Sequence, residues 1–294
     1  MLEVKNVFKS FKDKTVLRNL SLEVQEGSIF GLVGVNGAGK TTLLRTICGV
    51  FPPEEGEVLL DGHNTFKEAY IRKDLLFVSD DMYLPNVSNI RALKQFYGSF
   101  YDLNEEAYQK YLKVFDLSET QPFAGFSKGM KRQASLLFAL AIRPKLLLLD
   151  ECFDGLDPIV RLNFKKALVD LLEDQKSIVI ISSHNLKELE DICDSFGILD
   201  NGQINTYGDL LESKDMIWKY QLAFKEEVDK AVFAPFDIMN YKHEGTVYTL
   251  VIKGEKEEVK ARLEELHPLL LNELPVNFEE LFIYEVESRG MLNE

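Results

Sequence analysis

The stretch Gly34-Val35-Asn36-Gly37-Ala38-Gly39-Lys40-Thr41-Thr42 matches the pattern G-x-x-x-x-G-K-[ST] at every fixed position. The preceding segment 28–33 (SIFGLV) predicts a buried strand, and the residues from Thr42 onward predict a helix, which is the context the pattern requires. Glycines let the loop turn its N–H groups toward a polyphosphate, and the helix adds the positive end of its dipole. We therefore expect Lys40 to contact β- and γ-phosphates and the Thr41 hydroxyl to bind Mg²⁺. The alternative is a glycine-rich turn without a ligand.

The whole chain narrows the class of protein. Its 294 residues allow two domains, and 46% hydrophobic residues are enough for a buried core. A net charge of -14 argues against a surface that binds nucleic acid directly. The N-terminus does not read as a secretory signal, and apolar runs such as Leu146–Leu149 are far shorter than the roughly 20 residues that span a bilayer. Cys48, Cys152 and Cys193 lack metal-ligand spacing, which favours free thiols in a reducing cytoplasm.

Before and after the phosphate loop, the pattern alternates between strands and helices. Segments 2–7 and 20–24 alternate apolar and polar residues, as strands with one buried face do. Between them, Phe11 is either a core residue or a platform for a purine ring. A buried strand at 75–78 is followed by Asp80 and Asp81. The aromatic, amphipathic segment from 89 to about 117 predicts helices that pack on one another and also present a face to a partner.

A second group of polar residues follows two apolar runs. Leu146 to Leu149 reads as a central parallel strand buried on both faces, and it ends in Asp150 and Glu151. Open α/β sheets bind ligands at the carboxyl ends of their strands, so Asp150 can hold Mg²⁺ and Glu151 can orient an attacking water. A strand at 177–181 delivers His184 to the same edge, where it can donate a hydrogen bond to a γ-phosphate. The alternatives are a helix cap with incidental acids and a structural histidine.

The composition shifts beyond about Lys214. An Asn-Gly hairpin at 196–204 closes the first domain near Tyr207. We therefore divide the chain into a domain at 1–213, with a helical subdomain at about 86–143, and an accessory α+β domain at 214–294. The second domain has expected strands at 246–252 and 282–286 and a helix at 257–266. It carries no catalytic constellation, which favours a structural, dimer-forming or regulatory role.

With these motifs in order, residues from Met1 to about Leu211 resemble the ATP-binding subunit of an ATP-binding cassette (ABC) transporter. The resemblance implies an α/β fold of the P-loop NTPase class, with a parallel-sheet core, an antiparallel β subdomain and a helical subdomain. It makes Glu151, His184 and Lys40 catalytic, and it makes Thr41, Asp80 and Asp150 the metal ligands. The residues expected to bind ATP are Phe11, Val16, Asn36, Gly37, Ala38, Gly39, Lys40, Thr41, Thr42, Ser127, Gly129 and Asp157.

Two positions depart from the family pattern. The signature segment Phe126–Met130 reads FSKGM rather than LSGGQ, which keeps Ser127 and Gly129 but places Lys128 at a glycine position. This signature sequence resembles that of bacterial exporters of antimicrobial peptides, peptide toxins such as phenol-soluble modulins, or small drugs. At the Q-loop position, where the family carries Gln or Glu, this chain has Asp80. A carboxylate can bind Mg²⁺, but Asp is shorter by a methylene, so the metal contact and the relay to a membrane partner are open questions.

The resemblance implies an ATPase that uses ATP and Mg²⁺ at the cytoplasmic face of the membrane. Two ATP-binding subunits, identical or related, would close head to tail over two nucleotides and power separate transmembrane subunits. Two rivals stay open. One is a soluble cassette ATPase that acts on ribosomes or DNA, and the other is a regulatory or resistance ATPase that is not coupled to transport.

Overall fold

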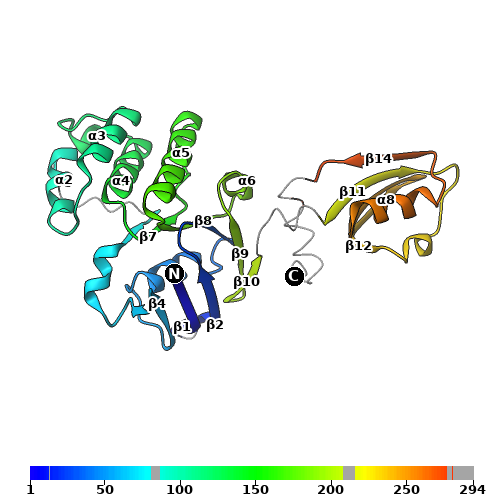
Figure 1. Cartoon of the computed structure of the whole chain (residues 1–294), viewed down its shortest axis with the longest axis horizontal. Coiled ribbons are helices and arrows are strands. Elements are labelled where there is room, and N and C mark those ends of the chain that lie inside the picture. The colour runs from blue at the N-terminus through cyan, green and yellow to red at the C-terminus, as the bar shows by residue number, and fades with distance from the viewer. Residues whose placement is uncertain (13, 81–86, 208–215, 277–279, 281–294) are drawn as a thin grey trace. The chain divides into compact units, whose positions relative to one another are not determined.

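A computed structural model describes residues 1–12, 14–80, 87–207, 216–276 and 280. The chain divides into two compact units, Met1–Tyr207 and Gly208–Glu294, and each has its own hydrophobic core (Figure 1). The sequence placed the division at 213/214, within the range 208–215 that lies outside the described residues. Within the described ranges, every helix is too short or too polar to cross a bilayer.

A six-stranded sheet forms the centre of the first unit. It contains β3 (Ile29–Val33), β6 (Leu75–Val78), β7 (Leu146–Asp150), β8 (Ile178–Ser183), β9 (Ser195–Asp200) and β10 (Gln203–Tyr207), in the order β10-β9-β3-β8-β7-β6. Only β10 runs antiparallel to its neighbour in this sheet, and the residues of β7 and β8 are buried throughout. Because β3, β6, β7 and β8 are parallel, the residues that follow them meet at one edge.

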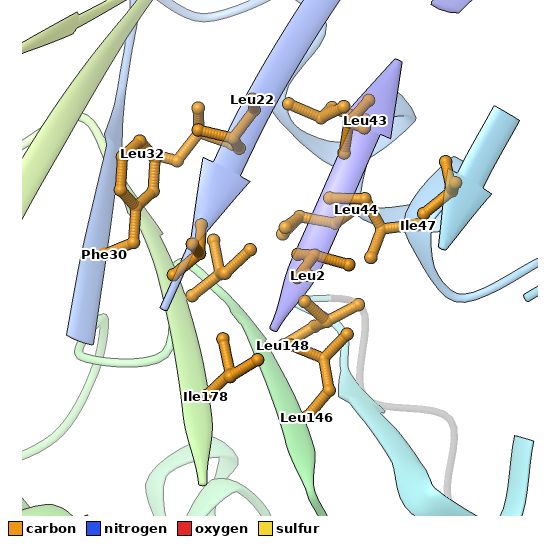
Figure 2. Close-up of a cluster of buried hydrophobic side chains, with 14 of the residues drawn as sticks. Leu2, Leu22, Phe30, Leu32, Leu43, Leu44, Ile47, Leu146, Leu148 and Ile178 are labelled. Carbon is orange, nitrogen blue, oxygen red and sulfur yellow. The ribbon is translucent and has the colours of Figure 1, made fainter. Parts of the chain in front are cut away.

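A second, antiparallel sheet packs over the first through helix α1 (Lys40–Ile47). It contains β1 (Leu2–Phe11), β2 (Lys14–Val24), β4 (Glu55–Leu60) and β5 (His63–Asn64) in the order β2-β1-β4-β5. In Figure 2, Leu44 of α1 lies beside Leu2 of β1, and Leu148 of β7 belongs to the same buried cluster. Each fully buried leucine stabilises this unit by about 1.5–3 kcal/mol. Strands β1 and β2 extend beyond the predicted segments because their pairing continues to Phe11 and Lys14.

Helices gather beside the β6–β7 end of the sheet (Figure 1). Within the aromatic segment the rings of Tyr97 and Tyr101 lie 6.3 Å apart between centroids, so the segment packs on itself as predicted. Tyr97 also stacks on Phe138, outside the segment, at 4.8 Å, while Phe100 stays 63% exposed. The helical elements of the first unit after α1 are η1 (Ala69–Asp74), α2 (Ile90–Gly98), α3 (Glu105–Val114), η2 (Phe123–Gly125), α4 (Lys128–Ile142), α5 (Pro158–Gln175) and α6 (Leu186–Glu190).

The described part of the second unit, 216–276, is a four-stranded antiparallel sheet with one α-helix against it. Its elements are β11 (Ile217–Ala223), η3 (Lys230–Phe233), β12 (Asp237–Glu244), β13 (Val247–Lys253), α8 (Lys256–Glu264) and β14 (Leu270–Leu274), with the strand order β12-β13-β11-β14. An aromatic core that includes Tyr220, Phe233 and Tyr248 holds it together. The strand predicted at 282–286 lies outside the described residues. The predicted fold class, a parallel-sheet core with antiparallel sheets and helices, is confirmed.

Candidate nucleotide-binding and catalytic site

The predicted phosphate loop joins the end of β3 to the start of α1. Gly39 has φ 109° and occupies the cap position of the helix, so an L side chain there would be strained. A Cβ added to Gly39 would also lie 2.8 Å from Val16 Cγ1. Gly37 likewise has a positive φ of 84°. The loop can therefore follow this path only with glycine at these positions, and it brings the predicted nucleotide-binding residue Val16 beside the loop.

Lys40 carries a buried positive charge at the base of the loop. Its side chain is 6% exposed, and Nζ donates to the carbonyl oxygen of Gly34 at 2.6 Å. The same Nζ lies 3.4 Å from Glu151 Oε1. A buried ammonium needs such partners because desolvation of a charge costs several kcal/mol. The loop therefore offers a cation, held in place by its own backbone, to a polyphosphate.

Asp150 is fully hydrogen-bonded at the end of β7. Its side chain is 2% exposed, Oδ2 accepts from Thr41 Oγ1 at 2.7 Å, and Oδ1 accepts from Ser182 Oγ at 2.6 Å. A hydroxyl and a carboxylate oxygen that meet in this way are the hard oxygen ligands Mg²⁺ takes in proteins, so Thr41 and Asp150 fit the predicted metal. Ser182 was not predicted, because its place directly opposite Asp150 in the parallel ladder is a tertiary pairing that the sequence does not show.

Glu151 and His184 form an ion pair at the same edge. Glu151 Oε2 lies 2.8 Å from His184 Nδ1 and also accepts from the backbone N–H of His184 at 3.3 Å. The carboxylate raises the pKa of the imidazole above its usual 6.5. Glu151 has φ 48°, a left-handed conformation that costs a residue other than glycine about 1–3 kcal/mol. Asp154, which was not predicted, places a carboxylate oxygen within 4.8 Å of the ligand atoms of Glu151 and His184.

The carboxylate of Asp80 is turned toward an arginine. Asp80 Oδ1 lies 2.6 Å from Arg132 Nη2, which also donates to the Asp80 carbonyl oxygen at 3.1 Å. Arg132 Nη1 donates to the carbonyl oxygen of Glu151. Arg132 is not among the predicted site residues. Asp81, which follows Asp80 in the sequence, lies outside the described residues.

The signature segment and Asp157, one of the residues expected to bind ATP, lie at two neighbouring helix N-termini. The Ser127 side chain caps α4 by accepting from the N–H of Met130, and the Asp157 side chain caps α5 by accepting from two backbone N–H groups. A Cβ added to Gly129 would lie 3.0 Å from the carbonyl oxygen of Gly155, so the two turns pack closely. Ser127 and Asp157 are exposed, which leaves this surface open to another molecule.

A pocket of about 450 Å³ adjoins the phosphate loop, and its lining includes Val16, Asn36, Gly37 and Ala38. The ring of Phe11 is 41% exposed and meets Phe51 edge to face, with centroids 5.2 Å apart. Exposed aromatic faces of this kind can stack on a base. The structure thus gathers Lys40, Thr41, Asp150, Glu151 and His184 into one cluster. Phe11 is not part of that cluster, and the signature segment forms a separate surface.

The chain is similar to known ATP-binding proteins of transporters. The family model described as "ABC transporter" matches residues 17–154. The chain is 34% identical to the ABC transporter ATP-binding protein YtrB of Bacillus subtilis (strain 168), over 96% of this chain and 97% of that protein. It is 33% identical to the linearmycin resistance ATP-binding protein LnrL of the same organism, over 71% and 69%. It is 28% identical to the methionine import ATP-binding protein MetN of Clostridium tetani (strain Massachusetts / E88), over 95% and 94%.

Solved structures share the fold of the first unit. The structure of the ATP-binding subunit of an ABC transporter superposes with a TM-score of 0.67 at 28% identity and covers 72% of this chain and 91% of that one. A dimeric cassette in a post-hydrolysis state, bound to ADP and Pi, superposes with a TM-score of 0.63. At 23% identity, this second likeness bears on the fold alone.

Proposed function

Because this chain belongs to the ABC transporter ATP-binding protein family, we propose that it powers an exporter of peptides or small drugs through separate transmembrane subunits. ABC ATPases hydrolyse ATP, and their cassettes dimerise and work with membrane subunits. Coupling to export, the cargo class and a position at the cytoplasmic face of the membrane are parts of the proposal. The FSKGM signature and the likeness to a linearmycin resistance protein support it. The direction of transport is the part that most needs testing, since a methionine import protein is also similar.

One observation carries the hydrolytic role: three ionisable side chains converge where the phosphate loop meets the ends of β7 and β8. Lys40 faces Glu151 at 3.4 Å, and Glu151 faces His184 at 2.8 Å. We assign Glu151 to orient the attacking water and accept its proton, His184 to contact the γ-phosphate, and Lys40 to neutralise charge on the β- and γ-phosphates. Glu151 is 14% exposed, which suits a carboxylate that must meet water on one side only.

The proposed nucleotide lies along the loop, with Phe11 and Val16 toward its base and sugar. The loop backbone from Asn36 to Thr42 would supply N–H groups to the phosphates. Thr41 and Asp150 would hold Mg²⁺, which neutralises charge on the phosphates when bound. In this role the Thr41 hydroxyl and the Asp150 carboxylate would turn their oxygens from each other to the metal.

We place Ser127, Gly129 and Asp157 in the second half of a site, opposite the phosphate loop of another ATP-binding subunit. The exposure of Ser127 and Asp157 at the N-termini of α4 and α5 supports this, because helix N-termini favour anions. Lys128, also exposed, adds a positive charge there. The dimer is head to tail, and either two copies of this chain or this chain and a relative would form it.

The test is ATP turnover by the purified chain alone and after reconstitution with a candidate transmembrane subunit, with and without amphipathic peptides. We expect turnover in the complex to rise with peptide, and Glu151→Gln to remove that rise. An ATP turnover rate that changes with neither the transmembrane subunit nor the peptides would refute the coupling of hydrolysis to transport. It would favour a regulatory or resistance ATPase.

A further inference from the structure

Arg132 contacts the backbone of the proposed catalytic glutamate from a buried position. It is 2% exposed, among the largest fully buried side chains of the described residues, and it projects from the second turn of α4. Nη1 donates to the carbonyl oxygen of Glu151, while Nη2 donates to the carbonyl and the carboxylate of Asp80. One guanidinium therefore joins the residues that follow two neighbouring parallel strands, β6 and β7.

The peptide that Arg132 contacts has a conformation that needs support. Glu151 has φ 48°, and its N–H donates to the carbonyl oxygen of Ser182 at 3.1 Å. Arg132 binds the carbonyl on the other side of the same residue. A left-handed residue persists only when its surroundings hold it. The direction of the Glu151 side chain, toward Lys40 and His184, follows from that backbone.

The buried guanidinium in turn depends on Asp80. A buried cation is stable when its charge is paired and its donors are bonded, and removal of one partner leaves an uncompensated charge. Asp80 supplies the one carboxylate that the structure pairs with Arg132 in the described part of the chain, with Oδ1 2.6 Å from Nη2. The family resemblance instead assigns the Asp80 carboxylate to Mg²⁺. The observed ion pair commits one of its oxygens to Arg132.

We propose that Arg132 is a positioning residue for Glu151, and that Asp80 serves as the counter-ion that keeps Arg132 in place rather than as a metal ligand. This inference rests on the proposed hydrolytic role of Glu151. Arg132 touches neither nucleotide nor metal; it holds the backbone from which the water-orienting carboxylate projects. A shift of the Asp80 segment would change turnover through this contact without changing how tightly ATP binds.

The test compares Arg132→Lys, Asp80→Asn and the double variant by steady-state hydrolysis at varied ATP and varied Mg²⁺. Lysine keeps the charge but cannot reach two backbone carbonyls and a carboxylate in the fork geometry of arginine. We expect kcat to fall about 10- to 100-fold in each single variant, as for other residues that support a catalytic group. We expect KM for ATP and the Mg²⁺ concentration for half-maximal rate to stay at wild-type values, and the double variant to be no slower than Arg132→Lys.

Matched controls come from the other end of the same helix. Arg143 pairs with Asp174 at 2.7 Å, and Arg143→Lys and Asp174→Asn make the same chemical changes away from the site. They should leave kcat unchanged. If Asp80→Asn instead raises the Mg²⁺ requirement and adds to the loss of Arg132→Lys, then Asp80 is a metal ligand and the proposal fails. It also fails if Arg132→Lys turns over like Arg143→Lys. If Arg132→Lys does not fold, the kcat and the Mg²⁺ requirement of Asp80→Asn still show whether Asp80 is a counter-ion or a metal ligand.

A second readout needs no turnover. Amide hydrogen exchange of the peptide over 150–155 should be about tenfold faster or more in Arg132→Lys than in Arg143→Lys, because the Glu151 turn opens more often. Equal exchange in the two variants would overturn the positioning role. Absence of hydrolysis by the wild-type chain would count against the proposed function, and the exchange measurement would still judge the contact between Arg132 and Glu151.

Discussion

Ser182→Ala should damage both the stability of the first unit and ATP turnover, because it removes a hydroxyl that bonds two residues of the site. Ser182 is fully buried, and its hydroxyl donates to Asp150 Oδ1 at 2.6 Å and accepts from the N–H of Glu151 at 3.2 Å. A hydrogen bond to a charged group contributes about 1.5–3 kcal/mol, whereas a neutral one contributes about 0.5–1.5 kcal/mol. Alanine would leave one carboxylate oxygen of Asp150, a residue only 2% exposed, without this donor. We expect a loss of about 2 kcal/mol in the free energy of unfolding.

Ser177→Ala is the matched control. Ser177 lies directly before the same strand, is also fully buried, and donates to the neutral carbonyl oxygen of Pro144 at 2.8 Å. Its loss should cost about 1 kcal/mol and leave turnover unchanged. Urea unfolding followed by circular dichroism measures both variants. Fluorescence of Trp218, the single tryptophan, reports the second unit and should not shift in either.

The rate of ATP hydrolysis should also differ between Ser182→Ala and Ser177→Ala. Without Ser182 the Asp150 carboxylate loses one of its two side-chain donors, so we expect ATP hydrolysis at saturating Mg²⁺ to fall about tenfold. Equal destabilisation by the two variants, or unchanged hydrolysis in Ser182→Ala, would show that Ser182 does not orient the Asp150 carboxylate.

Three further outcomes follow from the site. Since Glu151 raises the pKa of His184, the imidazole should titrate above pH 6.5 by NMR, and its pKa should return toward 6.5 in Glu151→Gln. The stability that this pair contributes is present below pH 6.5 and is lost as the pH rises through the raised pKa. Gly39→Ala should abolish binding of a fluorescent ATP analogue, because φ 109° and a close approach to Val16 leave no room for a Cβ. Phe11→Ala should weaken that binding about 5- to 100-fold, the loss expected for one stacked base, whereas Phe11→Trp should preserve it.

Much of the first unit could be predicted from sequence because its signals are local. A continuous apolar run such as Leu146–Leu149 predicts a buried parallel strand, and the loop pattern from Gly34 to Thr42 predicts a strand on one side and a helix on the other. Since parallel strands end at one edge, the meeting of Asp150, Glu151 and His184 could be expected without coordinates, and the structure brings them together.

The supporting contacts could not be predicted, because they join residues far apart in the sequence. Nothing near Arg132 indicates that its side chain reaches the residues after β6 and β7, and Ser182 reads as an ordinary strand end. In the second unit, β12 (Asp237–Glu244) carries mostly polar side chains and shows no clear alternation of apolar residues. This segment forms a strand because it pairs with β13, a contact that its own residue pattern does not indicate. For Asp80 the sequence left the role of the carboxylate open, and its partner is a tertiary contact.

We propose above that Glu151 turns a nucleotide-binding site into a hydrolytic one. The rate of phosphate release by the wild type and by Glu151→Gln, with ATP affinity measured on the same samples, tests this role. In Glu151→Gln, hydrolysis should fall by about 10²–10⁴-fold while ATP affinity is retained. Hydrolysis by Glu151→Gln at the wild-type rate would remove Glu151 from this role.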